Sequence, residues 1–180
     1  MSFVLPMPVL ETERLVLRGW CKDDFDAIAA IFGDDENARF IGGKKAGWEA
    51  WRHFAMIIGH FNLRGFTAFA VEHRQTNETI GYVGPWYPEG WPEPEIGYSL
   101  VPSAGGKGYA TEAAVASLKY AYSKLGWATA ISMMNKKNQG SKNVAQKMGA
   151  IFEKDSLLFG TSEAEIWRHL PPQEFQERFA

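Results

Sequence analysis

Apolar residues recur every three or four positions in four parts of the chain, which is the spacing of one buried helix face. They predict helices over residues 25–32, 48–61, 114–125 and 139–148. Asp23 or Asp24 can cap the first of these helices. Trp51 lies on the apolar stripe of the second helix, so we expect it in the core. The last three helices are each followed by a glycine that suits a helix end, at Gly65, Gly126 and Gly149.

Short apolar or alternating runs predict the strands. They cover residues 15–18, 67–72, 79–87, 95–101, 128–134, 150–159 and 163–170. Polar residues 75–78 join the second and third strands as a hairpin. The resulting element order is β-α-α-β-β-β-α-β-α-β-β, without repeats or a low-complexity linker, and it predicts a single domain over residues 1–180. The predicted fold class is α/β (α+β), with helices packed around a mixed sheet.

Composition restricts the location and the partners of the chain. It has 46% hydrophobic residues and a formal net charge of −2, which supplies a core but no general basic field for nucleic acid. Cys21 is the single cysteine, so neither an intramolecular disulfide nor a cluster of thiolate ligands can form. No apolar run approaches the roughly 20 residues of a membrane span, and the N-terminus lacks the features of a signal peptide. We therefore expect a cytoplasmic protein with no membrane partner.

The histidines do not have metal-ligand spacing. His53 and His60 are seven residues apart on one predicted helix, which separates them by about 10 Å along the axis, too far to share an ion. His73 and His169 have no neighbour at ligand spacing. No metal is expected.

Candidate chemistry concentrates in EIGYSLVPSAGGKGYATEAA, residues 95–114. A predicted strand runs into a glycine-rich loop, and the loop opens a helix. The first N–H groups of a helix have no internal partner and attract anions. Because Gly105, Gly106 and Gly108 have no Cβ, a pyrophosphate can approach the backbone closely. Lys107 adds a positive charge, so the loop predicts a phosphate-binding site.

Two common phosphate loops do not fit these residues. A P-loop needs a lysine followed by serine or threonine, whereas Lys107 is followed by Gly108. A dinucleotide loop needs a third glycine where Thr111 stands. An unrelated nucleotide-binding protein that uses this loop for ATP or NAD stays open as an alternative.

The stretch GKGYATEA, residues 106–113, resembles motif A of the GNAT superfamily of acetyl-CoA-dependent N-acetyltransferases. That motif is usually written Gln/Arg-x-x-Gly-x-Gly/Ala. Gly106 and Gly108 match it, and Ser103 departs from it at the first position. The departure removes one side-chain contact but leaves the backbone cradle.

Two further segments resemble one branch of that superfamily, the ribosomal-protein alanine N-acetyltransferases. NQGSKNVAQKMG, residues 138–149, is similar to a motif downstream of motif A, with Asn143 in place of the usual basic residue. ETERLVLR, residues 11–18, is similar to the opening of that branch. Together the three segments span nearly the whole chain in the expected order.

The resemblance implies a GNAT-type fold, a mixed, mostly antiparallel central sheet flanked by helices and splayed between strands 4 and 5. Here these strands are residues 95–101 and 128–134. Acetyl-CoA is the implied cosubstrate, with pantetheine in the gap and an N–H near Leu100 as donor to the acetyl carbonyl. The implied cofactor-binding residues are Ser99, Leu100, Val101, Ala104, Gly105, Gly106, Lys107, Gly108, Tyr109, Ala110, Asn138 and Ser141.

The resemblance also implies catalytic roles. By position, Glu95 is the general base for the amine, directly or through water, and Ser141 is the proton donor to the departing sulfur. Each has a structural alternative, because Glu95 could be a solvated strand residue and Ser141 an N-cap. Glu112 is interpreted as structural, since the helix dipole favours a carboxylate in the first turn. Trp86 and Trp91, beside the proline-rich loop before strand 95–101, are candidate acceptor contacts.

The predicted function is transfer of an acetyl group from acetyl-CoA to a primary amine by direct attack. The acceptor is a protein N-terminus, a small metabolite or an antibiotic, and the residues do not choose among these. A non-catalytic acetyl-CoA-binding sensor or partner module shares every cofactor feature and is the alternative function. A homodimer is common in the family and compatible with this sequence.

Overall fold

The computed structural model describes residues 6–158 and 160–180. Its strands are β1 (Leu10–Glu11), β2 (Leu15–Arg18), β3 (Phe69–His73), β4 (Thr79–Trp86), β5 (Glu95–Leu100), β6 (Ile131–Asn135), β7 (Ile151–Leu158) and β8 (Ser162–Arg168). Within the described residues they form one sheet in the order β1-β2-β3-β4-β5-β6-β8-β7. Neighbouring strands are antiparallel except β5 and β6, which are parallel.

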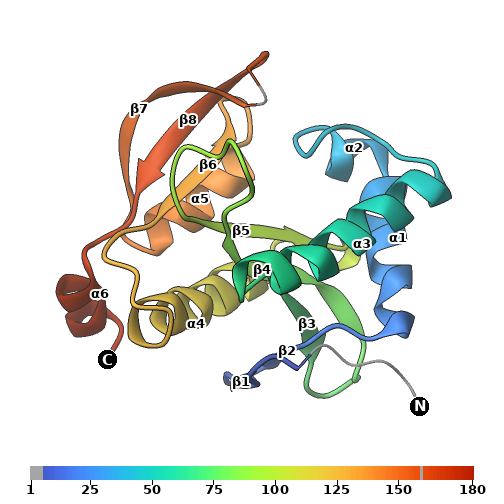
Figure 1. Ribbon diagram of the computed structural model, residues 1–180, viewed down its shortest axis with the longest axis horizontal. Helices are drawn as coiled ribbons and strands as arrows, with labels where there is room; N and C mark the ends of the chain where they lie inside the picture. The colour runs from blue at the N-terminus through green and yellow to red at the C-terminus, as the bar shows by residue number, and fades with distance from the viewer. Residues whose placement is uncertain (1–5, 159) are drawn as a thin grey trace.

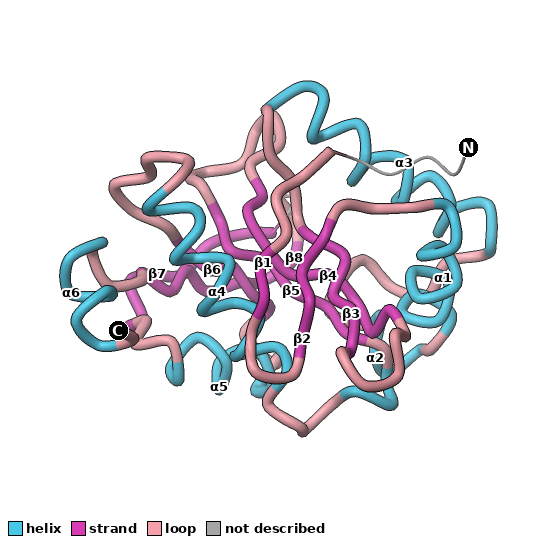
Figure 2. The backbone as a smooth tube through the Cα atoms, turned by 90° about the horizontal axis from the view of Figure 1, so that it is seen from below, coloured by secondary structure: helices cyan, strands magenta, loops and turns pink. Residues whose placement is uncertain are grey.

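The helices lie on both faces of this sheet. They are α1 (Phe25–Gly33), α2 (Asp35–Ala38), α3 (Gly47–Arg64), α4 (Tyr109–Ser123), α5 (Gln139–Lys147) and α6 (Pro172–Arg178). Helices α1, α2 and α3 lie toward one end of the molecule, and β7, β8 and α6 lie toward the other (Figure 1). Figure 2, seen from below, shows the same separation, with the C-terminus beside α6.

Each face of the sheet has its own hydrophobic core. On one face α4 packs along β4 and β5, with Leu118 and Ala121 fully buried. On the other face α1 and α3 pack around Trp20, whose indole N–H donates to the carbonyl of Ala68 at 2.7 Å. Burial of apolar surface on both faces, at about 25 cal/mol per Å², fixes β4 and β5 in place.

All the predicted helices and strands are present, and the described strands β3 and β4 form the predicted hairpin. Their ends differ: predicted strand 128–134 begins at Ile131, and predicted helix 114–125 runs from Tyr109 to Ser123. Predicted strand 150–159 reaches Phe159, which lies outside the described residues. Elements β1, α2 and α6 were not predicted, since β1 and α2 are very short and α6 buries a single apolar residue, Phe175.

The predicted core position of Trp51 is wrong, because its side chain is 47% exposed. The buried positions of α3 are Ala50, Phe54, Ile57 and His60. The true stripe is therefore rotated by about one position from the predicted one. Trp51 packs its ring against Phe54 at the edge of that core, with centroids 5.7 Å apart.

The predicted capping role of Asp24 is also wrong. Asp24 stands at the start of α1 but makes no capping hydrogen bond to that helix. Its carboxylate instead accepts from Arg18, Thr79 and the N–H of Cys21. Burial alone would raise the pKa of Asp24, but these hydrogen bonds lower it below its ordinary value. Asp24 thus ties β2 to β4 and closes the short 3-10 helix Lys22–Asp24 that precedes α1, rather than capping α1 itself.

The predicted splay between two central strands is confirmed. Strands β5 and β6 share one bridged pair, Glu95 with Ile131, before they separate. Strand β5 stays paired to β4 over its whole length, and β6 pairs with β8 over five residues. The sheet therefore divides into two paired parts with a gap between them, as the mixed, mostly antiparallel fold class requires.

Candidate active site

The register of β5 decides which backbone groups face the gap. Val101 donates its N–H to Ile80 at 2.9 Å, and hydrogen-bonded pairs alternate along an antiparallel ladder. Ser99 is therefore also bonded to β4, whereas the N–H groups of Tyr98 and Leu100 point toward β6. The carbonyl of Val101 accepts from the N–H of Ala104. The backbone groups of Ser99 and Val101 are thus paired within the chain, whereas the N–H of Leu100 faces the gap.

Side chains, not backbone, occupy the ladder where the splay begins. After the pair Glu95–Ile131, a regular parallel ladder would bond the N–H of Met133 to the carbonyl of Ile96. Instead Met133 donates to Oε1 of Glu95 at 3.1 Å, and Ile96 accepts from Oγ of Ser132 at 2.9 Å. The side chains of Glu95 and Ser132 therefore replace the missing backbone hydrogen bond, so that both strands keep their polar groups paired where they separate. We call this pair of side chains the wedge.

A buried histidine supports this wedge. Nε2 of His169 lies 2.9 Å from Oγ of Ser132. The single hydroxyl proton of Ser132 is given to Ile96, so Nε2 of His169 must carry a proton and donate it. Burial lowers the pKa of His169 to about 4, and the ring is neutral at physiological pH.

Glu95 is buried, with 6% of its surface exposed, so the alternative that it is a solvated strand residue is wrong. Its Oε2 accepts a hydrogen bond from the indole Nε1 of Trp91. Burial raises the pKa of Glu95 to about 7, against the opposing effect of the bonds from Met133 and Trp91. A carboxyl with this pKa is suited to accept a proton near neutral pH.

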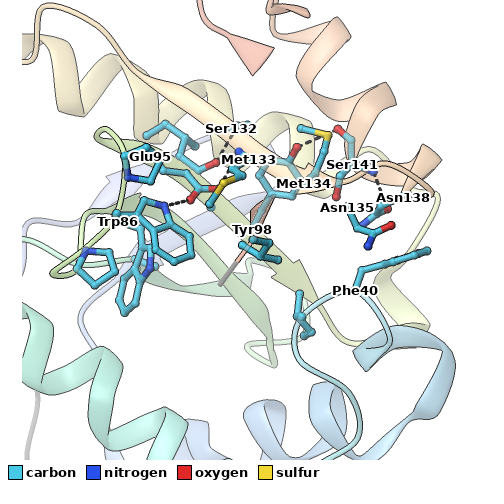
Figure 3. A pocket seen from close by; sticks show the side chains of 18 of the residues that line it. Phe40, Trp86, Glu95, Tyr98, Ser132, Met133, Met134, Asn135, Asn138 and Ser141 are labelled. Carbon is cyan, nitrogen blue, oxygen red and sulfur yellow. Dashed lines mark hydrogen bonds between the residues drawn. The ribbon is translucent and has the colours of Figure 1, made fainter. Parts of the chain in front are cut away.

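A cavity of about 540 Å³ opens at Glu95, and we call it the Glu95 cavity. Both predicted acceptor contacts, Trp86 and Trp91, line it. Figure 3 shows Glu95 and Trp86 at one side of the cavity, Ser141 and Asn138 at the other, and Tyr98 between them. The cavity therefore connects the buried carboxylate to the start of α5.

A second cavity, of about 660 Å³, lies along the glycine loop, and we call it the loop cavity. The predicted cofactor residues that line it are Ser99, Leu100, Val101, Ala104, Gly105, Gly106, Gly108, Tyr109, Ala110, Asn138 and Ser141. Lys107 is not among its lining residues. The two cavities share a boundary, since both are lined by Phe40, Ile41, Tyr98, Asn138 and Ser141.

The glycine loop is held by the opening motif of the chain. Arg14 donates from Nη1 to the carbonyl of Lys107 at 3.0 Å and from Nε to Glu112 at 2.7 Å. Thr12 also donates to Glu112, at 2.6 Å. Burial alone would raise the pKa of Glu112, but these partners lower it. Glu112 therefore has a structural role, as predicted. Its carboxylate is held by the side chains of Thr12 and Arg14 in addition to the helix dipole.

Two glycines give the loop its course into α4. Gly106 and Gly108 have φ of +74° and +83°, which side chains rarely adopt. Gly108 stands at the N-terminus of α4 and has no side chain to cap it. The first N–H groups of α4 are consequently available to a ligand in the loop cavity.

Asn138, not Ser141, caps helix α5. Oδ1 of Asn138 accepts from the N–H of Ser141 at 3.0 Å, so the interpretation of Ser141 as the N-cap is wrong. The carbonyl of Ser141 accepts from the hydroxyl of Tyr98 at 2.9 Å. That bond joins α5 to β5 across the splay, and Ser141 is held where the two cavities meet.

A family model described as an acetyltransferase (GNAT) domain matches residues 14–151, well over half of the chain. The chain belongs to the GNAT acetyltransferase family. GNAT acetyltransferases use acetyl-CoA, and the protein is accordingly an acetyltransferase. The match contains Arg14, Glu95, the glycine loop and the start of α5.

Relatives agree with this membership. An uncharacterized N-acetyltransferase of Bacillus subtilis (strain 168), YoaA, is 31% identical over 157 residues, covering 84% of this chain and 86% of that protein. The crystal structure of an acetyltransferase from Agrobacterium tumefaciens str. C58 is 28% identical, with a TM-score of 0.83, and the match covers 94% and 98% of the two chains. A ribosomal L7/L12 alpha-N-protein acetyltransferase in complex with coenzyme A shares the fold, with 16% identity, a TM-score of 0.73, and 94% and 99% coverage.

Some residues of the site were not predicted from the sequence. Tyr98 was not predicted as a site residue, although it lies in the strand EIGYSL directly after Gly97. Phe40 and Ile41 precede a glycine pair that signals a chain break, and they line both cavities from the segment after α2. Ser132 carries no motif signal. In the described part of the chain, no helix is long and apolar enough to cross a membrane, and no group of three potential metal ligands is found.

Proposed function

We propose that this GNAT protein transfers the acetyl group of acetyl-CoA to a primary amine. One observation carries the proposal: a loop cavity suited to phosphate and a cavity ending at buried Glu95 meet at Tyr98, Asn138 and Ser141. A cofactor held by the loop and an amine held at Glu95 would approach each other at that boundary. The two-cavity arrangement matches a transfer between two separate substrates.

The residues of the loop cavity fit acetyl-CoA. The glycines at 106 and 108 leave the backbone open, and Arg14 fixes the carbonyl of Lys107 by a hydrogen bond. We expect the loop and α4 to hold the pyrophosphate, and Leu100 and Asn138 to hold the pantetheine. When bound, acetyl-CoA supplies an acetyl thioester.

Three groups of the chain serve the transfer. Glu95 accepts a proton from the ammonium form of the acceptor and so releases the nucleophilic lone pair. The N–H of Leu100, which faces the gap, donates to the acetyl oxygen as negative charge develops there. Ser141 donates a proton to the departing sulfur and recovers one from the attacking nitrogen. Overall a nitrogen–carbon bond forms and a carbon–sulfur bond breaks, while one nitrogen proton leaves through Glu95 and a second reaches the sulfur through Ser141.

The three motifs, at residues 11–18, 106–113 and 138–149, also support placement in the branch that resembles the ribosomal-protein acetyltransferases. Thr12 and Arg14 bind Glu112, so the motifs at residues 11–18 and 106–113 are in direct contact. Placement in this branch does not imply that the acceptor is a ribosomal protein.

Product analysis separates this function from its alternative. The protein is incubated with acetyl-CoA and a panel of primary amines, and acetylated products are measured by mass spectrometry. We expect enzyme-dependent acetylation of at least one amine. Saturable acetyl-CoA binding with no product from any amine would instead support a non-catalytic acetyl-CoA-binding module.

A further inference from the structure

The Glu95 cavity offers a ligand one buried negative charge. Its described lining residues include no lysine and no arginine. His53 lines it but is neutral at physiological pH, because burial, with a smaller effect of Lys45, lowers its pKa to about 4. Besides Glu95, Glu89 lines the cavity, but its side chain is 98% exposed and pairs with Arg64. A bound molecule therefore finds a buried partner for one cation and none for an anion.

The remaining walls are largely apolar and come from separate parts of the fold. Large apolar side chains line the cavity from the segment after α2, from α3, from β4 and the loop beyond it, from β6 and from β7: Phe40, Met56, Trp86, Trp91, Met133 and Leu157. Clefts of this volume typically enclose small molecules. The walls suit an apolar group considerably larger than the methylene chain of a lysine.

Aromatic rings stand next to the single charge. Trp91 donates its indole N–H to Glu95, and Trp86 lies directly opposite Glu95 in the β4–β5 ladder. Trp86 is itself held by stacking on His60, with ring centroids 4.3 Å apart. An ammonium that reaches Glu95 is therefore close to indole rings, which attract cations.

We propose that the acceptor is a small primary amine with one positive charge, an aromatic or branched apolar group, and no carboxylate. This inference rests on the proposed function and names its substrate class. A free amino acid would bury its carboxylate without a cation, and a polyamine would bury further ammonium groups without anions, both of which are costly. A peptide N-terminus would bring backbone polar groups against these apolar walls.

Four acceptors test the proposal, because three of them each differ from the first by a carboxylate, by additional ammonium groups in place of the ring, or by a peptide backbone. They are 2-phenylethylamine, phenylalanine, spermidine, and a tripeptide amide with N-terminal phenylalanine. With saturating acetyl-CoA, kcat/KM for 2-phenylethylamine should exceed that for each of the others by at least about tenfold, the discrimination expected from unmatched charges. Equal or better use of phenylalanine, spermidine or the peptide would overturn the proposal.

A charge introduced into the wall provides a second test. Met56 lines the cavity on α3, while Leu63 lies on the same helix, is 86% exposed and does not line the cavity. Met56→Lys supplies the missing cation, so the ratio of kcat/KM for phenylalanine to that for 2-phenylethylamine should rise at least about tenfold. Leu63→Lys adds the same charge elsewhere and should leave the ratio unchanged. An unchanged ratio in Met56→Lys would contradict the inference.

Binding measurements separate failure of this inference from failure of the proposed function. Acetyl-CoA binding is measured by calorimetry, and 2-phenylethylamine binding by the fluorescence of the tryptophans at the cavity. Absence of acetyl-CoA binding refutes the proposed function. Acetyl-CoA binding together with no fluorescence change and no acetylation of 2-phenylethylamine refutes the acceptor class alone. Saturable quenching by 2-phenylethylamine, absent with phenylalanine and spermidine, supports it.

Discussion

Glu95→Gln is the substitution that separates a catalytic carboxylate from a structural one. Glutamine keeps the shape of the side chain but cannot take a proton from an amine. It also has one acceptor oxygen, whereas Glu95 accepts from two donors, the N–H of Met133 and the indole of Trp91. The variant therefore removes the base and leaves one of these donors facing an amide nitrogen.

The stability effect follows from the pKa of Glu95, which rises from 4.5 to about 7 on folding. The native state then holds the proton more tightly than the unfolded chain, so its stabilising effect is full below pH 4.5 and is lost as the pH rises toward 7. Between pH 5 and 8.5 the loss is about 2.5 kcal/mol, at about 1.36 kcal/mol per unit of pKa. Glu95→Gln should lack this loss, although its unpaired donor costs about 1–3 kcal/mol at every pH. Urea unfolding across this pH range measures both quantities.

The kinetic effect should be larger. Loss of a general base typically lowers kcat by about 10²–10⁴-fold. With an alkylamine acceptor, which is mostly protonated below pH 9, the logarithm of kcat/KM should rise with a slope of about 1 below pH 7, where Glu95 must lose its proton. It should level off between pH 7 and 9, because ionised Glu95 itself takes the proton of the ammonium group. The Glu95→Gln variant should show a slope of about 1 throughout.

Glu89→Gln is the matched control, since Glu89 lines the same cavity but is exposed. It should keep the wild-type rate and the change of slope near pH 7. If Glu95→Gln retained that rate and that change of slope, Glu95 would be a structural wedge without a role as base.

Other substitutions test other parts of the site. Arg14→Ala removes the support of the glycine loop, so the Kd for acetyl-CoA should rise about tenfold or more in calorimetry, and an unchanged Kd would show that the loop keeps its shape unaided. Ser141→Ala should lower kcat about 10–100-fold with little change in KM for acetyl-CoA or in Tm, and full activity would exclude it as the proton donor. Asn138→Ala should instead lower stability by about 1 kcal/mol through the lost cap, seen as a lower urea midpoint. Ser132→Ala should cost about 1–3 kcal/mol, because Ile96 and His169 lose their shared partner, and wild-type stability would refute the wedge.

Local signals made much of this site predictable. The glycine loop is a contiguous segment, and the positive φ values of Gly106 and Gly108 confirm why glycine stands there. Apolar periodicity located the helices and strands, since each buries one face. It placed Trp51 wrongly because a large apolar residue beside a buried stripe cannot be told from one within it.

Contacts between distant segments could not be read from the sequence. Arg14 and Glu112 are 98 residues apart, and nothing near either one marks the pairing. Ser132 gains its role from the divergence of two strands, and the interpretation of Ser141 as a cap overlooked the capping oxygen of Asn138 three residues earlier. The Glu95 cavity is assembled from segments spread between Phe40 and Gly160, so its charge pattern emerges only in the folded chain.

The proposed transfer requires that the loop cavity takes acetyl-CoA and presents it to an amine at Glu95. The first requirement is measured by calorimetric titration of the purified protein with acetyl-CoA, beside ATP and NAD. We expect saturable binding of acetyl-CoA, silent controls, and weaker binding by Arg14→Ala. No acetyl-CoA binding up to millimolar concentration, or equal binding of ATP or NAD, would contradict the proposed function.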